Sequence, residues 1–226
     1  MNILSIETST QVCSVALTAK DRLLIHRIHQ EGSNHAALLP IFVNEILAYA
    51  REQNIHIDAI SISEGPGSYT GLRIGTSIAK GLAYGLGCEL IPVPTLAILA
   101  AAARQQIDNN VALFCPMIDA RRMEVYTQIY DANLQPLNEV EARVVENNEW
   151  LRAIGKEIYF FGDGASKCRS ILECESIHYL DNIIVDAQYM HTFALNTSAR
   201  ADIAYYIPFY LKDFQAAPSH IKGLDI

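Results

Sequence analysis

Residues 6–17, IETSTQVCSVAL, consist of two short apolar runs on either side of a polar Ser-Thr turn. Such a pattern predicts two strands joined as a β-hairpin. A third apolar run at residues 22–29 adds another strand, and residues 34–52 have the apolar spacing of a helix. The chain is therefore predicted to open with three antiparallel strands followed by a helix.

Beyond residue 57 the pattern changes from a meander to alternating strands and helices. We expect strands at residues 58–63 and 88–93, each followed by a helix, at residues 70–86 and 95–105. Strands that alternate with helices form β-α-β units with parallel pairing. The first part of the chain is thus predicted to be a mixed sheet with helices packed on it.

The same opening recurs from about residue 110. MIDARRMEVYTQ, residues 117–128, again joins two strands through a polar turn, and this repeat predicts two structurally related βββαβα lobes. The elements expected in this part are strands at residues 111–118, 123–131, 136–145 and 157–161 and helices at residues 147–153, 163–173 and 188–205.

These elements divide the α/β chain into two lobes and a tail. We expect the first lobe at residues 1–105 and a shorter, degenerate second lobe at residues 106–214, whose C-terminal helix can pack back on the first. Residues 215–226, QAAPSHIKGLDI, have little to bury and are expected to be mobile.

The composition limits the kinds of protein that this chain can be. Half of the 226 residues are apolar and 19% are charged, so the chain can bury a core. The formal net charge of −8 argues against a protein that holds nucleic acid through its own phosphate contacts, which need a basic face. Five cysteines without regular spacing indicate neither a zinc site nor a disulfide framework. With no basic leader and no apolar run long enough for a membrane, we expect a cytoplasmic protein.

The two polar turns are candidates for binding phosphate. In the actin/hexokinase-type (ASKHA) architecture, such turns face each other across a cleft and hold the phosphates of ATP and their metal. The hydroxyls of Thr8, Ser9 and Thr10 and the carboxylate of Asp119 have suitable chemistry. Ser, Thr and Asp are also common in tight turns that bind nothing, and this alternative stays open.

GPGSYTGLRIG, residues 65–75, is rich in glycine and precedes a predicted helix. It fits neither the P-loop nor the dinucleotide fingerprint, because Thr70 stands where each pattern needs a glycine. A tight Pro-Gly turn between strand and helix is the simpler interpretation.

The helix after this loop contains four glycines, each of which costs up to about 1 kcal/mol relative to Ala. Gly71, Gly75 and Ala79 form one stripe of small residues, and a second stripe lies on another face. The second stripe consists of Ser77, Gly81 and Gly85. We expect close approach to the sheet on one side and to another helix on the other. The alternative is crowding within the domain alone.

The predicted helix at residues 34–52 has an apolar arc broader than one sheet face needs, and exposed apolar patches usually mark partners. We predict that it forms one docking face with the glycine-containing helix, for a paralogue or a second copy. The residues expected there are Leu38, Leu39, Phe42, Val43, Ile46, Gly71, Gly75, Ala79 and Lys80. A bulky residue at Gly75 or Ala79 is expected to abolish association without unfolding the monomer.

Five stretches, in this order and at this spacing, resemble the bacterial TsaB family, also called YeaZ. They are IETSTQVCSVAL, NHAALLPIF, SEGPGSYTGLRIGTSIAKGLAYGL, IPVPTLAILA and DARRMEVY. The resemblance is dense over residues 3–126 and thin afterwards, where only FGDGA and YLKDF match.

The resemblance implies an actin/hexokinase-like fold and a part in the threonylcarbamoyl modification of adenosine 37 in tRNAs that read codons beginning with A. It implies a non-catalytic scaffold that pairs with a longer catalytic paralogue, TsaD, and with a small ATPase, TsaE. It also implies a homodimer when the chain is alone, only indirect contact with tRNA, and ATP or ADP at most at the partner interface. Arg73, near a helix start, is a further candidate for contact with such a nucleotide.

The sequence departs from the catalytic paralogue where that protein has a metal-binding HxxxH pair. Thr95 and Leu99 stand at these positions and cannot replace two imidazoles. Glu7 stands where the family more often has Asp, and its longer side chain suits a metal-water ligand poorly. We therefore expect neither a metal site nor a tightly bound cofactor. HExxH and GxSxG are absent, so peptidase activity is not expected.

The main alternative is an autonomous ATP-using enzyme of the same fold, such as a kinase. That enzyme would bind Mg-ATP without a partner and would need Glu7 or Asp119 for turnover.

Overall fold

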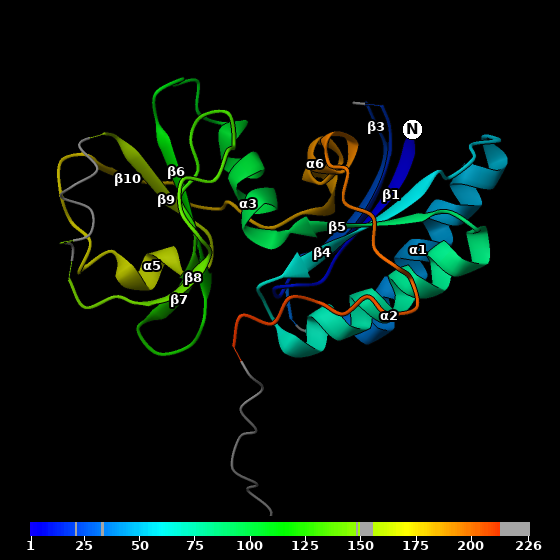
Figure 1. The fold of residues 1–226 in the computed structure, drawn as a ribbon, viewed down its shortest axis with the longest axis horizontal. Helices are drawn as coiled ribbons and strands as arrows, with labels where there is room; N and C mark the ends of the chain where they lie inside the picture. The colour runs from blue at the N-terminus through cyan, green and yellow to red at the C-terminus, as the bar shows by residue number, and fades with distance from the viewer. Residues whose placement is uncertain (21, 33, 148, 150–155, 213–226) are drawn as a thin grey trace, which may run out of the picture.

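A computed structural model describes residues 1–20, 22–32, 34–147, 149 and 156–212. The chain forms two five-stranded sheets, one in each half of the sequence, with helix α3 between them (Figure 1). Within this part of the chain no helix is long and apolar enough to cross a membrane.

The first sheet has the strand order β3-β2-β1-β4-β5. Its strands β1 to β3 pair in antiparallel fashion, whereas β4 and β5 join as parallel strands beside β1. The bounds are Asn2–Glu7 for β1, Cys13–Ala19 for β2, Arg22–His29 for β3, Ala59–Gly65 for β4 and Glu89–Pro94 for β5. The predicted meander followed by parallel units is confirmed.

The second sheet repeats this arrangement. Its order is β10-β9-β6-β7-β8, so that β6 to β8 form the antiparallel meander and β9 and β10 the parallel side. The bounds are Leu113–Asp119 for β6, Glu124–Thr127 for β7, Glu141–Val144 for β8, Ile158–Phe161 for β9 and Ile177–Tyr179 for β10. The predicted structural repeat is confirmed. β7 and β8 are shorter than expected because the chain between them turns back through isolated bridges at Tyr130, and β10 was not predicted.

The helices differ between the two halves. The first half has α1 (His35–Glu52), α2 (Tyr69–Leu86) and α3 (Thr95–Arg104), as predicted. The second half has α5 (Ala165–Cys168), η1 (Ala187–Tyr189) and α6 (His191–Asn196). The helix expected at residues 163–173 is therefore only one turn long. The helix expected at residues 147–153 lies largely outside the described residues. The tail expected to be mobile, residues 215–226, lies wholly outside them.

The helix expected at residues 188–205 is wrong beyond Asn196. From Thr197 to Lys212 the chain forms an irregular segment, here called the strap, which runs along α2 (Figure 1). Backbone bonds to β5 and β4 hold it, from Ala201 N to Leu90 O at 2.9 Å and from Phe209 N to Glu64 O at 2.7 Å. These bonds replace the intrahelical ones.

Two apolar cores flank the first sheet. α1 and α2 lie together on one face, where buried residues such as Leu39, Ile46 and Ala79 meet the strand residues Leu4 and Ile60. α3 lies on the other face, and all of its residues before Arg104 are buried. The core around α3 also contains Phe114 and Phe161 of the second sheet, so the two lobes share an apolar junction.

Candidate functional site

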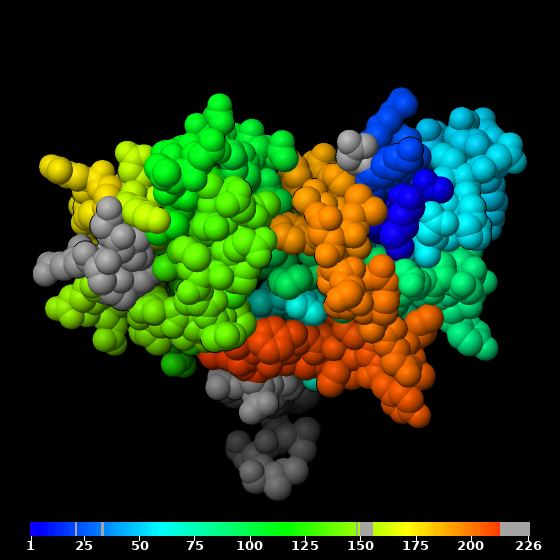
Figure 2. Space-filling model, turned by 45° about the horizontal axis from the view of Figure 1, so that its top comes forward, coloured from blue at the N-terminus to red at the C-terminus, as the bar shows by residue number. Residues whose placement is uncertain are grey.

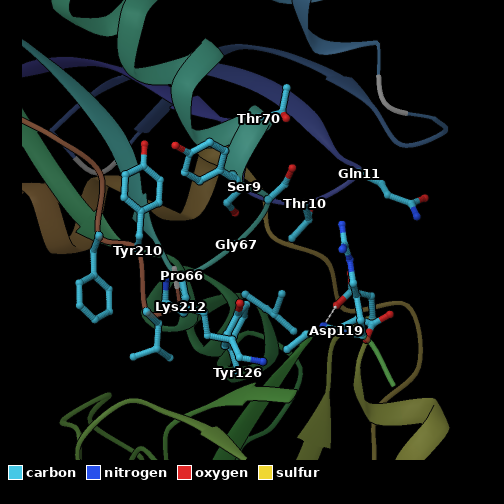
Figure 3. Close-up of a pocket in the computed structure, with 18 residues that line it drawn as sticks. Ser9, Thr10, Gln11, Pro66, Gly67, Thr70, Asp119, Tyr126, Tyr210 and Lys212 are labelled. Atoms are coloured by element: carbon cyan, nitrogen blue, oxygen red, sulfur yellow. Dashed lines mark hydrogen bonds between the residues drawn. The ribbon is translucent and has the colours of Figure 1, made fainter. Parts of the chain in front are cut away.

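A cleft of 410 Å³ lies between the lobes (Figure 3). It is bounded by the turn after β1, the glycine loop after β4, the end of β6 with its turn, and the end of the strap. The lining residues are Ser9, Thr10, Gln11, Pro66, Gly67, Ser68, Tyr69, Thr70, Ile118, Asp119, Ala120, Arg121, Tyr126, Asp163, Phe209, Tyr210, Leu211 and Lys212. The two polar turns predicted to face each other do so across this space. Figure 2 shows the surface hollowed between the second lobe and the strap.

The turn after β1 is held by bonds within its own lobe. Thr8 is fully buried, and its hydroxyl donates to Gly71 O at 2.8 Å. The amide and the hydroxyl of Ser9 both donate to Glu7 Oε1 at 2.5 Å, and Ser9 O accepts from Ser68 N at 2.6 Å. Of the three residues whose hydroxyls were expected to meet phosphate, Ser9 and Thr10 line the cleft and Thr8 does not.

Glycines in the loop and in α2 allow the backbone of the turn after β1 to pack closely against both. A Cβ at Gly67 would lie 2.4 Å from Ser9 O, and one at Gly71 would lie 2.0 Å from Thr8 O. Side chains cannot fit at such distances. The loop at residues 65–71 is therefore a tight connection between strand and helix, packed against the neighbouring turn.

Glu7 lies behind the turn and not in the cleft. Its side chain is fully buried, and burial raises its pKa to about 7 despite the bonds from Ser9. One carboxyl oxygen, Oε2, has no hydrogen-bond partner. Glu7 is not among the residues that line the cleft, and its poor fit to a metal-bound water stays a prediction.

The second wall is built around Asp119. Its carboxylate is half exposed, accepts from Arg121 N at 2.8 Å and pairs with Lys167. Asp163, which follows β9, accepts from Asp119 N at 2.9 Å. Asp163 is exposed, but partial desolvation at this sheet edge raises the pKa of its carboxyl. The ends of the neighbouring parallel strands β6 and β9 therefore bring two carboxyl groups together.

The sequence interpretation missed Asp163 and the aromatic residues of the cleft. Asp163 belongs to the FGDGA stretch and follows a predicted strand, so its position at the sheet edge could have been inferred. Tyr126 projects from the second lobe (Figure 3). Tyr69 and Tyr210 pack together with their ring centroids 4.8 Å apart. Tyr210 begins the YLKDF stretch, but no periodic pattern places it at the cleft, because the strap has no regular structure.

Arg73 does not line the cleft. Its guanidinium stands over the ring of Tyr69, 4.3 Å from the centroid, and donates from Nε to the Tyr210 hydroxyl at 3.4 Å. Its predicted contact with nucleotide stays a prediction, as do those of Thr8, Ser9, Thr10 and Asp119.

The positions that correspond to a metal-binding histidine pair lie in the apolar junction. Thr95 and Leu99 are buried on α3, and Thr95 Oγ1 accepts from Gly65 N at 3.1 Å. Among the described residues no three His, Cys, Asp or Glu side chains gather in a way that could hold a metal ion.

The residues expected at the docking face divide into two groups. Leu39, Val43, Ile46, Gly71, Gly75 and Ala79 are buried within the first lobe. Leu38 and Phe42 are half-buried, and Lys80 Nζ donates to Ala204 O and Tyr206 O of the strap at 3.0 and 3.1 Å. Contact of these residues with a partner stays a prediction.

The expected effect of a bulky residue at Gly75 needs correction. A Cβ there would lie 2.3 Å from Thr8 Oγ1 and 3.0 Å from Ile62 Cδ1. Ala79 is likewise fully buried against the sheet. A large side chain at either position would therefore disrupt the lobe itself and could not leave the monomer intact.

The second stripe on α2 has a different environment. Ser77, Gly81 and Gly85 are exposed, and a Cβ at either glycine would have no atom within 4 Å among the described residues. Nothing in this part of the chain requires glycine there. We call Ser77, Gly81 and Gly85 the outer stripe.

Comparison with known proteins identifies the family of the chain. A family model described as TsaD, tRNA N6-adenosine threonylcarbamoyltransferase, matches residues 28–218. The tRNA threonylcarbamoyladenosine biosynthesis protein TsaB of Bacillus subtilis is 31% identical over 177 residues, which cover 76% of each chain. Proteins of the same name from Haemophilus influenzae and Escherichia coli are 39% and 38% identical. These two matches cover 56% and 58% of this chain, and the chain spans about half the length of those relatives, 52% and 55%.

Solved structures support the same grouping. A Pseudomonas aeruginosa protein described as similar to peptidase YeaZ has a TM-score of 0.79 at 25% identity, covering 93% of this chain and 99% of that one. A second structure, YeaZ from Pseudomonas aeruginosa, has a TM-score of 0.77 with the same identity and coverage. The predicted two-lobed actin/hexokinase-like α/β fold is confirmed.

Proposed function

The chain belongs to the TsaB (YeaZ) family, and on this basis we propose that it is a non-catalytic scaffold subunit in the biosynthesis of threonylcarbamoyladenosine in tRNA. Its proposed partners are a catalytic TsaD-like paralogue and a TsaE-like ATPase. In this proposal the chain contacts tRNA only indirectly, acts in the cytoplasm and forms a homodimer when its paralogue is absent.

The outer stripe of α2 is the observation that carries this proposal. A glycine in an exposed helix interior costs about 1 kcal/mol relative to Ala, and Gly81 is such a residue. Gly85, in the last turn of α2, also lies next to open space. A second helix that approaches closely would benefit from the missing side chains. Ile41, which is 53% exposed on α1, and the half-buried Phe42 add apolar surface on the neighbouring helix.

The state of the cleft supports a role without catalysis. The hydroxyls of Thr8 and Ser9 are bonded within the first lobe, and Lys167 is paired with Asp119. Arg121 and Lys212 are balanced by Asp119 and Asp163, so the lining has no excess of positive charge for a triphosphate. In this proposal ATP or ADP binds only where the chain meets its partner.

Light scattering on a sizing column tests the proposal directly. The protein is run alone and then mixed with its TsaD-like paralogue, with and without ATP. We expect a one-to-one complex that displaces any homodimer, because both associations would use the same helical face. A chain that does not bind the paralogue and hydrolyses Mg-ATP by itself would contradict the scaffold role and favour the kinase-like alternative.

A further inference from the structure

The strap has a course that links the two lobes on the open side of the cleft. It leaves α6 on the first lobe, where Arg200 pairs with Glu89 at 2.7 Å, and then follows α2 toward that helix's N-terminus. Its last residues, Phe209 to Lys212, form part of the cleft wall. The strap therefore starts on one lobe and ends beside the other.

Several contacts fix the strap to the first lobe. Lys80 binds two of its carbonyl groups, and Phe209 N donates to Glu64 O at the end of β4. Gly65 gives the strap room there, since a Cβ would lie 2.3 Å from Phe209 O. The ring of Tyr210 then packs on Tyr69 at the start of α2. The strap is thus held at many points on this side.

Among the described residues, one ion pair joins Lys212 of the strap to the second lobe. Lys212 pairs with Glu124, the first residue of β7, which is 19% exposed, while Lys212 itself is 38% exposed. Figure 3 shows Lys212 beside Tyr126, across the cleft from Ser9 and Thr10. Within the described residues the strap therefore makes more polar contacts with the first lobe than with the second.

The lobes also meet around α3, mainly through apolar side chains and through a hydrogen bond from Arg104 Nε to Ala132 O at 3.0 Å. Leu96, Ile98 and Ala100 on that helix belong to one core with Phe114 and Phe161 of the second lobe. An apolar junction is non-directional and tolerates small rotations better than a hydrogen-bonded one. The lobes thus meet at a broad junction around α3 and at a polar fastening where the strap ends.

From this arrangement we propose that the strap is a latch: the pair of Lys212 and Glu124 holds the lobes closed over the cleft, and its release lets the second lobe rotate about the α3 junction. The latch sets the width of the cleft in the free chain. It requires neither a catalytic partner nor a bound nucleotide, so it does not depend on the proposed scaffold role.

Distances between spin labels on the two lobes test the latch in the full-length chain. One label is placed on Cys174, the exposed cysteine of the second lobe, and the other on Gln53→Cys at the end of α1. Cys88, which is half-buried, is replaced by Ser, and the remaining cysteines are buried. Glu124→Gln removes the charge at nearly constant shape. Asp181→Asn is the matched control, because it removes the pairing of Asp181 with Arg169 within the second lobe.

We expect Glu124→Gln and Lys212→Met each to raise the ratio of open to closed distances about twofold to fivefold, the range that a partly exposed ion pair supports. High salt should move the unaltered protein in the same direction, whereas Asp181→Asn should leave the distribution unchanged. Tyr210→Ala should open the lobes further. Identical distributions in the Glu124 and Lys212 variants and in the unaltered chain would overturn the latch, as would an equal response of the control.

Discussion

The two lobes have the same strand order but different helical cover. Each sheet joins three antiparallel strands to two parallel ones, yet the first carries two helices of 18 residues and the second a helix of four residues at the place that corresponds to α2. The pattern of strands is thus sufficient for the architecture. Among the described residues, the long helices pack on the first sheet.

The turns that face the cleft differ in the same way. The turn after β1 is buried beneath α2, with Thr8 and Ser9 at 0% and 1% exposure. The turn after β6 is open, the side chain of Asp119 is 49% exposed, and Arg121 and Arg122 adopt positive φ angles. A long helix packs on the first turn, whereas the short α5 holds the second turn through its Lys167 side chain, which donates to Arg122 O and Glu124 O.

The largest expected difference between the lobes concerns the glycines beside these turns. Gly71→Ala would bring a Cβ to 2.0 Å from Thr8 O, which is backbone and cannot move aside. At Gly164 of the second lobe the nearest atoms would be 2.9 Å away. We expect Gly71→Ala to lower the free energy of unfolding by about 3 kcal/mol or more and Gly164→Ala by about 1–2 kcal/mol.

Urea denaturation of both variants measures these values. Because each substitution adds one methyl group at the end of a strand-to-helix connection, the two serve as controls for each other. Equal losses of stability would show that the two turns are held equally tightly and would remove the distinction between the lobes.

A second expected difference concerns pH and depends on Glu7. Burial raises the pKa of this carboxyl from 4.5 to about 7, so the folded chain keeps a proton that the unfolded chain releases. Its contribution to stability is present below pH 4.5 and is lost as the pH rises through about 7. Across this window the free energy of unfolding should fall by about 3 kcal/mol on account of Glu7.

Chemical denaturation at pH 5, 6, 7 and 8 checks this dependence. Glu7→Gln resembles the protonated side chain and should largely remove the fall in stability. Glu157→Gln, on an exposed residue of the second lobe, should leave it in place. A Glu7→Gln variant with the same pH dependence as the unaltered protein would mean that Glu7 is already ionised in the fold.

Most of the first lobe could be predicted from sequence. Alternating apolar runs place β1 to β5 and their helices closely, because each run is bounded by a turn or a capping residue such as Ser68. The second lobe was harder. Its strands are short, and β10 spans only three residues. The strap stands where a helix was expected beyond Asn196, and no local sequence pattern reveals its backbone bonds to the first lobe.

The site was predictable where it depends on strand ends. Ser9, Thr10 and Asp119 line the cleft because each follows a strand that ends there. The burial of Gly75 and Ala79 was misjudged because a stripe of small residues does not reveal which neighbour it meets. Only tertiary packing distinguishes Gly75, which abuts Thr8, from Gly81, which faces open space.

The measurement that tests the central claim most directly uses the Gly81→Leu variant. Light scattering monitors its association with the TsaD-like paralogue, and thermal denaturation measures the stability of the variant alone. Leu is a better helix former than Gly, so the monomer should gain about 0.5–1 kcal/mol of stability while the complex is lost. Ser170→Leu, on an exposed position of the second lobe, adds a similar side chain and should bind normally. A stabilised Gly81→Leu chain that still forms the complex would contradict docking through the outer stripe.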